Sequence, residues 1–175
     1  GSGLCGALCN DISLGFYNWT PIGSSRVFSG SFEGGGYTVR GLFIDLADTY
    51  AGLFGKIEGG GGHKIQNLTV SGTIAVDGKV TYAGGIAAYV SGVSSGDCYL
   101  LENCHSRVSI TLDGVKALDT GIGGVAGRSR YAILSCCSNT GSVTLGEAVR
   151  GNITYYAGGL VGSAYASTTI QRSYN

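Results

Sequence analysis

The sequence predicts an all-β fold, a parallel β-solenoid of about four coils with an N-terminal capping segment. Three observations lead to this prediction. A glycine followed by two apolar or small residues recurs every 33 to 39 residues, and a second recurring line of residues follows each copy in the same order. No window of the chain carries a sustained helical period. A single repeat of this kind cannot bury its apolar face, whereas stacked copies share one continuous core.

The N-terminal part lies outside the repeats. We interpret residues 1–3 as a cloning remnant and residues 4–45 as a cap or first coil, because FYNWTPIG and FSGSFEGGGYTVRGLFID are strand-turn-strand segments without the repeat motif. A solenoid needs an atypical end coil, since an open end exposes strand edges. Residues 46–175 then hold the repeats. We expect the native polypeptide to continue, because the final IQRSYN stops within a repeat.

Each repeat consists of two lines that have the character of strands. The first reads TYAGLFGKI, TYAGGIAAY, TGIGGVAGR and YYAGGLVGSA, and the second reads IQNLTVSGTI, LENCHSRVSITL, LSCCSNTGSVTL and IQRSYN. Turns such as DGK and DGV separate them, and paired glycines suit a tight corner. Parallel stacking places equivalent positions about 4.8 Å apart. Aligned on Gly52, Gly85, Gly124 and Gly159, the repeats predict two internal ladders: Leu53, Ile86, Val125 and Leu160, and Ile65, Leu101, Leu134 and Ile170.

The composition argues against several classes of partner. Only 13% of the residues are charged and the net charge is zero, so the chain has no electrostatic footprint for nucleic acid or an anionic membrane. No apolar run approaches the roughly 20 residues that a spanning helix needs. We therefore expect neither nucleic-acid binding nor membrane insertion.

The phrase YAGGLVG, the line I-x-x-(S/C)-(Y/C)-(N/S) that follows it, and the lead-in FSGSFEGGGYTVRGL after NWTPIG resemble the GLUG-motif family. These are bacterial repeats of large secreted or cell-surface proteins, including adhesins and accessory regions of immunoglobulin A proteases. The resemblance implies a β-solenoid stalk or adhesive region in an extracellular or cell-surface protein, with a host protein or glycan as partner. It implies no catalytic residues and no cofactor. The alternative is a carbohydrate-binding module attached to a secreted enzyme.

Tyrosines are the main candidates for a binding surface. Tyr50, Tyr82 and Tyr156 precede the Ala-Gly phrase in three of the four repeats, where the remaining repeat has Thr120 or Gly121. If this column faces solvent, its flat rings with hydroxyl tips can stack on sugars or be buried by a protein partner. If it faces inward, its role is structural. Further tyrosines accompany it at Tyr89, Tyr99, Tyr131 and Tyr155.

The six cysteines leave two alternatives open. Cys104 and Cys137 occupy equivalent positions in consecutive coils, where the preceding coil has Leu68. At about 4.8 Å apart they suit either a disulfide or two stacked, buried thiols that act as small apolar groups. Cys5 and Cys9, in the segment CGALC, could form a short-loop disulfide. Cys98 and Cys136 could form a bridge across loops.

Neither a metal site nor a catalytic site is predicted. The segment DCYLLENCH offers zinc-ligand types, but it contains no C-x₂-C pair, and neighbouring residues of a strand point to opposite faces. The candidates considered are Asp97, Cys98, Cys104, His105 and Cys136. Polysaccharide cleavage requires carboxylates gathered on one face. The acidic residues are scattered in turns, and we expect no equivalent position to be acidic in two consecutive coils. Two acids within about 10 Å in one groove would reopen the question.

Overall fold

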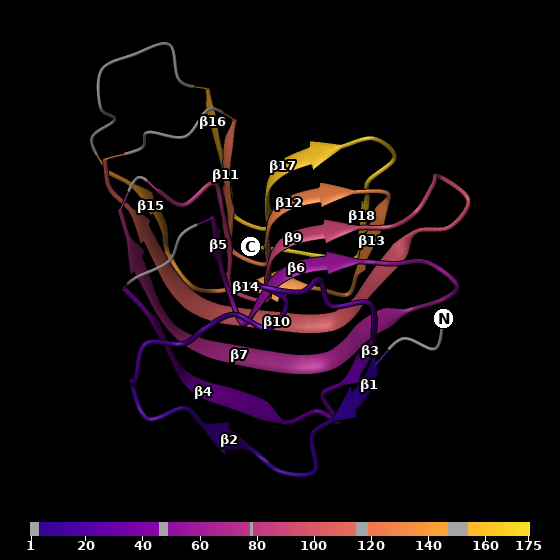
Figure 1. Ribbon diagram of the computed structural model, residues 1–175, viewed down its shortest axis with the longest axis horizontal. Coiled ribbons are helices and arrows are strands. Elements are labelled where there is room, and N and C mark those ends of the chain that lie inside the picture. The colour runs from indigo at the N-terminus through magenta and orange to yellow at the C-terminus, as the bar shows by residue number, and fades with distance from the viewer. Residues whose placement is uncertain (1–3, 46–48, 78, 115–118, 147–153) are drawn as a thin grey trace.

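The computed structural model describes residues 4–45, 49–77, 79–114, 119–146 and 154–175, and these contain strands and no helix (Figure 1). All pairings between the strands are parallel, and the coils stack along one axis as a β-solenoid of about four turns. The predicted fold class is therefore confirmed. The interpretation of residues 1–3 as a cloning remnant lies outside the described residues.

The strands form three sheets that run along the solenoid. The first sheet is the largest, and its long strands curve beneath the other two sheets in Figure 1. It comprises β1 (Leu4–Ala7), β2 (Ile12–Ser13), β3 (Gly30–Glu33), β4 (Thr38–Ile44), β7 (Lys64–Val76), β10 (Tyr99–Leu112), β13 (Ala132–Ser135), β14 (Ser138–Asn139), β15 (Val143–Leu145) and β18 (Thr169–Gln171).

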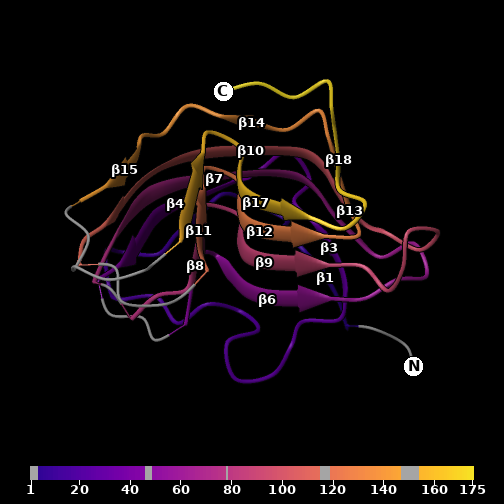
Figure 2. The same cartoon turned by 90° about the horizontal axis from the view of Figure 1, so that it is seen from above.

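The other two sheets meet at the glycine corner of each coil. The second sheet contains β5 (Tyr50–Ala51), β8 (Tyr82–Gly84), β11 (Thr120–Gly123) and β16 (Tyr155–Gly158). The third contains β6 (Phe54–Glu58), β9 (Ala87–Ser91), β12 (Ala126–Arg130) and β17 (Val161–Tyr165). Figure 2 shows the strands of the third sheet stacked in chain order. Because the chain turns sharply between these sheets, each coil has a bend whose corner points toward the first sheet and whose open side faces away from it (Figure 1).

Both predicted ladders are present in the core. Leu101 pairs with Ile65 on one side and with Leu134 on the other, and Leu134 pairs with Ile170. In the other ladder, backbone hydrogen bonds run from Phe54 to Ile86 and onward through the equivalent residues of the next coils, Val125 and Leu160. The inner members are almost fully buried, and burial of each aliphatic side chain contributes about 1.5–3 kcal/mol.

The second glycine of each corner lies against a small polar side chain from the first sheet. A Cβ atom at this glycine would lie 2.2 Å from the nearest side-chain atom in all three pairs: Gly85 with Ser106, Gly124 with Asn139, and Gly159 with Asn175. These distances leave no room for even a methyl group. The two segments of each repeat are therefore coupled through the core. The absence of a side chain at the corner glycine of the first segment leaves a space, and a polar side chain of the second segment fills it.

The first coil differs from the others both at the corner glycine and at the side chain that packs against it. Tyr50 pairs with Tyr82, yet Phe54 pairs with Ala87, so the first coil has one residue fewer between these two strands. Gly52 is level with Gly84 in the register of β5 and with Gly85 in the register of β6, so the predicted alignment holds on the side of the Leu53 ladder. The position equivalent to Ser106 is Val70, a larger apolar residue. The first coil thus has one corner residue fewer, and it has valine where the second coil has the serine that packs against the corner.

The N-terminal segment covers part of the solenoid end. Strands β3 and β4 pair with β7, and β1 and β2 lie outermost. Ile22 and Phe28 form parallel bridges to the third sheet at Phe54 and Ile57. Among the described residues, β5 pairs only with β8, so the N-terminal edge of the second sheet stays uncovered. This uncovered edge forms one side of a groove.

Candidate functional site

The predicted tyrosine column exists, and it lies on the outside of the second sheet. Tyr82 pairs with Tyr50 on one side and with Gly121 on the other, and Gly121 pairs with Tyr156. The residues that follow them in these strands point inward, because side chains alternate along a strand. Ala83 is fully buried, for example, whereas Tyr82 is half-exposed and Tyr156 is 42% exposed.

A second column meets the first across the bend of the coil. Tyr89 in the third sheet pairs with Lys56 and with Arg128. The ring centroids of Tyr82 and Tyr89 are 5.7 Å apart, and those of Tyr50 and Tyr82 are 6.1 Å apart in a stacked arrangement. We call the combined surface the tyrosine face, comprising Tyr50, Lys56, Tyr82, Tyr89, Arg128, Tyr156 and Tyr165.

Arg128 binds to two levels of this face. Its Nη1 atom donates to the Tyr82 hydroxyl at 2.6 Å and to the carboxylate of Asp119. Its guanidinium carbon lies 5.4 Å from the ring centroids of both Tyr82 and Tyr165. Partial burial opposes the positive charge, but the bonds to Asp119 and Tyr82 outweigh it and raise the pKa of Arg128. The side chain therefore remains a cation held between two rings, an arrangement that contributes about 0.5–2 kcal/mol per contact.

The cations of the tyrosine face are paired with acids. Lys56 Nζ lies 2.8 Å from a carboxylate oxygen of Glu58, and this bond raises the pKa of Lys56. Burial raises the pKa of the Tyr50 hydroxyl, so that it stays protonated near neutral pH. Beside the face, the hydrogen bond to Tyr131 and a further bond to Tyr89 raise the pKa of Arg130 and add an exposed guanidinium. The face therefore presents aromatic rings and hydroxyl groups, with the charges of Lys56 and Arg128 neutralised by acids. Such a surface suits neutral partners through ring stacking and hydrogen bonding.

The structure places Tyr155 and Tyr99 away from this face, whereas Tyr131 borders it through Arg130, which also bonds to Tyr89. Tyr155 pairs with the fully buried Thr120 and so points to the inner side of its strand; its 44% exposure reflects its place in the last coil. Tyr99 is fully buried, its hydroxyl donates to the carbonyl of Gly30 at 2.5 Å, and burial raises its pKa. Tyr131 lies under the guanidinium of Arg130 at 4.8 Å. Alternation within the repeat could have distinguished Tyr155 from Tyr156.

No disulfide joins the six cysteines, all of which lie in the described residues, so the structure has the stacked-thiol alternative. Cys104 pairs with Leu68, and the register on both sides of it places Cys137 at the equivalent position of the next coil. Both side chains are fully buried. The neighbouring Cys137 thiol and burial together raise the pKa of Cys104, which keeps it protonated. The remaining cysteines are exposed or half-buried: Cys5, Cys9, Cys98 and Cys136.

The residues considered as zinc ligands point in different directions. His105 binds Ser138 Oγ at 2.8 Å and Asn103 Oδ1 at 3.0 Å on the outer side, while Cys104 faces the core. Asp97 accepts a hydrogen bond from Gly61 at 2.6 Å. Within the part of the chain that the structure describes, no group of three or more histidine, cysteine or acidic residues is arranged to hold a metal ion.

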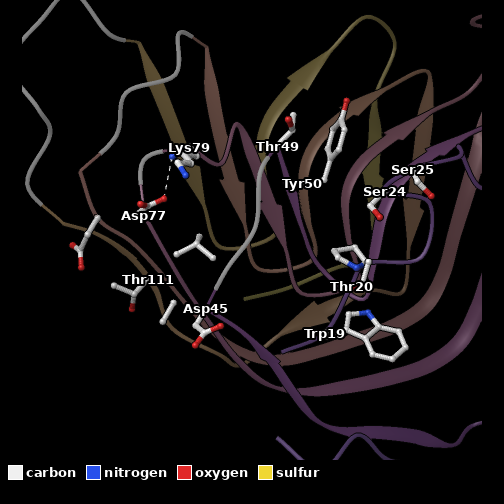
Figure 3. A pocket seen from close by; sticks show the side chains of 14 residues that line it. Trp19, Thr20, Ser24, Ser25, Asp45, Thr49, Tyr50, Asp77, Lys79 and Thr111 are labelled. Atoms are coloured by element: carbon white, nitrogen blue, oxygen red, sulfur yellow. Dashed lines mark hydrogen bonds between the residues drawn. The ribbon is translucent and has the colours of Figure 1, made fainter. Parts of the chain in front are cut away.

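The expectation that acids would not recur at equivalent positions was wrong. Val76 pairs with Leu112, and the residues that follow them directly are Asp77 and Asp113. Together with Asp45 they line a groove of about 870 Å³ at the N-terminal end of the solenoid (Figure 3). The recurrent turns DGK and DGV carried this signal in the sequence. The condition under which catalysis was to be reconsidered, two acids within about 10 Å in one groove, is therefore met, since residues at equivalent positions of neighbouring coils lie about 4.8 Å apart.

Comparison with known proteins places the chain in no family. No family model matches it, and no solved structure matches it. A protein of Evansella cellulosilytica described as a "Putative Gly-rich membrane protein" is 35% identical over 102 residues, which cover 53% of this chain. The matched region spans only 12% of that relative's length. In the described residues of this chain, we find no helix of the length and apolarity needed to cross a bilayer.

Proposed function

We propose that the chain is a non-catalytic adhesive or spacer module of a bacterial cell-surface or secreted protein. The observation that supports this most directly is the tyrosine face, in which Tyr50, Tyr82 and Tyr156 share one column along the solenoid axis. Three of the four coils place a tyrosine in this column, and the third coil has Gly121 there. Weak contacts made by successive coils add up when the partner is itself repetitive or displayed at high density.

Two further observations fit a module within a longer surface protein. The GLUG-like motifs belong to repeats of that kind. The Evansella cellulosilytica relative is described as a membrane protein, and the matched region is a small part of it. We propose an extracellular or cell-surface location for this chain, with a host protein or glycan as the partner of the tyrosine face.

A second candidate function is a carbohydrate-binding module attached to a secreted enzyme. The pairing of Lys56 with Glu58 and of Arg128 with Asp119 favours it, because the tyrosine face then carries little charge. Flat rings with hydroxyl tips, such as that of Tyr89, are suited to neutral sugars.

The test compares adhesion of beads that carry the chain on arrays of host matrix proteins and of glycans. The variant Tyr82→Ala with Tyr156→Ala removes two levels of the face, and circular dichroism checks that it folds. Tyr174→Ala is the matched control, because Tyr174 is 65% exposed and bridges to Ser138 in the first sheet. Adhesion supports an adhesive role if it increases with the density of the chain on the bead surface and is lost in the double variant.

The other outcomes separate the alternatives. Binding confined to the glycan array and lost in the double variant identifies a carbohydrate-binding module. If the beads bind on neither array, the result contradicts the adhesive role and supports the spacer role. Equal binding by the wild type and the double variant would show that the tyrosine face is not the contact surface.

A further inference from the structure

The groove at the N-terminal end is separate from most of the tyrosine face. It lies between the cap segment and the uncovered edge of β5, and the ends of β4, β7 and β10 close its far side. Figure 3 shows Trp19 and Tyr50 on one side and Asp77, Lys79 and Thr111 on the other. Its volume of about 870 Å³ falls within the roughly 300–1,000 Å³ of small-molecule sites.

The aromatic side of the groove is held in place by the solenoid itself. The indole Nε1 of Trp19 donates to the carbonyl of Leu53 at 3.1 Å, and its backbone NH bonds to Phe43 at 2.8 Å. With its only donor already used, the Trp19 ring offers apolar surface to a ligand. Tyr50 adds a second ring, fixed against Tyr82 by stacking. The two rings stand apart from each other on the same side of the groove (Figure 3).

The opposite side offers hydrogen-bonding groups that remain available. Among the described residues, no hydrogen bond or ion pair uses the carboxylate of Asp45 or Asp113, and both residues are exposed. Asp77 accepts from the backbone NH of Lys79 at 3.4 Å and keeps its second oxygen open. Five serine and threonine hydroxyls also line the groove. Each hydroxyl can both donate and accept, and each carboxylate can accept two bonds.

The charge of the lining decides which ligand suits it. Among the described residues that line the groove, three are carboxylates and one, Lys79, carries an ammonium group, so this lining is negative. Anionic sugars such as uronates would be repelled by these like charges. A neutral sugar meets no such cost, since its hydroxyl groups can bond to the carboxylates while its apolar face packs on the rings.

We propose that this groove binds a neutral oligosaccharide. The inference deepens the proposed binding role by naming a ligand class, but apart from Tyr50 it depends on residues outside the column that the array experiment tests. Asp45, Asp77 and Asp113 accept hydrogen bonds from the sugar, and Trp19 and Tyr50 contact its C–H face.

The experiment uses the intrinsic fluorescence of Trp19, the sole tryptophan of the chain, as a reporter inside the groove. Cellotriose, mannotriose and maltotriose are the neutral probes, trigalacturonate is the anionic probe, and trilysine is the cationic probe. The groove variant is Asp45→Asn with Asp113→Asn, which removes charge while keeping size. The matched control is Asp11→Asn, an exposed carboxylate paired with Arg40 outside the groove.

We expect at least one neutral trisaccharide to change Trp19 emission saturably. The groove variant should weaken its binding about tenfold or more, the equivalent of one or two charge-assisted hydrogen bonds. The control Asp11→Asn should bind it as the wild type does, and so should the single tyrosine-face variant Tyr156→Ala, which leaves Tyr50 and its stacking on Tyr82 intact. Loss of array adhesion with retained trisaccharide binding would therefore separate the two surfaces.

Several results would overturn the proposal. These are silence of all neutral probes, equal binding by the groove variant, or a response to trigalacturonate or trilysine in place of the neutral sugars. Mass spectrometry of the trisaccharide after incubation with the protein can give one further result that contradicts the proposal. Cleavage that disappears in Asp77→Asn or Asp113→Asn would replace simple binding with glycoside hydrolysis.

Discussion

Substituting Gly85 by alanine tests the coupling between the two lines of the repeat. The added Cβ atom would lie 2.2 Å from Ser106 Oγ and 2.7 Å from the carbonyl oxygen of Gly124. The hydroxyl can rotate away, but it then loses the hydrogen bond that it accepts from the buried NH of Val108 at 3.3 Å. Overpacking costs about 1–3 kcal/mol, and the lost bond costs about 1 kcal/mol. We therefore expect Gly85→Ala to lower the free energy of unfolding by about 2–4 kcal/mol.

Urea unfolding followed by circular dichroism measures this loss. With a slope of about 2 kcal/mol per molar urea, the midpoint should fall by about 1–2 M. Ser106→Ala alone should cost about 1 kcal/mol, and the double variant should cost less than the sum of the two, because the clashing oxygen is gone. Gly96→Ala is the control, since no atom lies within 4 Å of its added Cβ. An unchanged midpoint for Gly85→Ala, or strictly additive effects, would refute the coupling.

Two further predictions concern acid stability and the buried thiols. The bonds from Gln66, Gly35 and Asn67 lower the pKa of Glu33, so its ionised form stabilises the fold above pH 4.5 and this contribution is lost as the pH falls. Glu33→Gln should thus be less stable than the wild type at pH 7, with the difference shrinking below pH 4.5 in a series of thermal melts; a constant difference would contradict this. Without reductant, a thiol-specific reagent should titrate six thiols in denaturant, while Cys104 and Cys137 stay protected in the native state, and a count of four in denaturant would establish a disulfide instead.

The repeated part of the fold could be predicted because stacking converts sequence periodicity into spatial columns. Once the coils are parallel and in register, residues such as Leu101 and Leu134 must meet, and so must Tyr50 and Tyr82. The amino-acid composition of each strand was enough to identify the two recurring strand segments of each repeat. No knowledge of the coil's shape was needed.

Features that depend on the shape of a coil could not be predicted in the same way. Arg128 reaches Tyr82 only because the chain bends sharply between the second and third sheets. The groove exists because the cap segment pairs with β6 and leaves β5 uncovered, and the cap does not follow the repeat. The adjacency of Asp77 and Asp113 was visible in the sequence, but it was missed because the turns were treated separately from the repeat.

The fit between Gly124 and Asn139 limits how such a chain can lengthen during evolution. The glycine comes from the corner of its coil, and the asparagine comes from the next strand of the first sheet. A genetic duplication that copied one of these two positions without the other would leave a corner without the side chain that fills it. Whole coils are therefore the smallest pieces that can be gained or lost without leaving a hole or a clash at the junction.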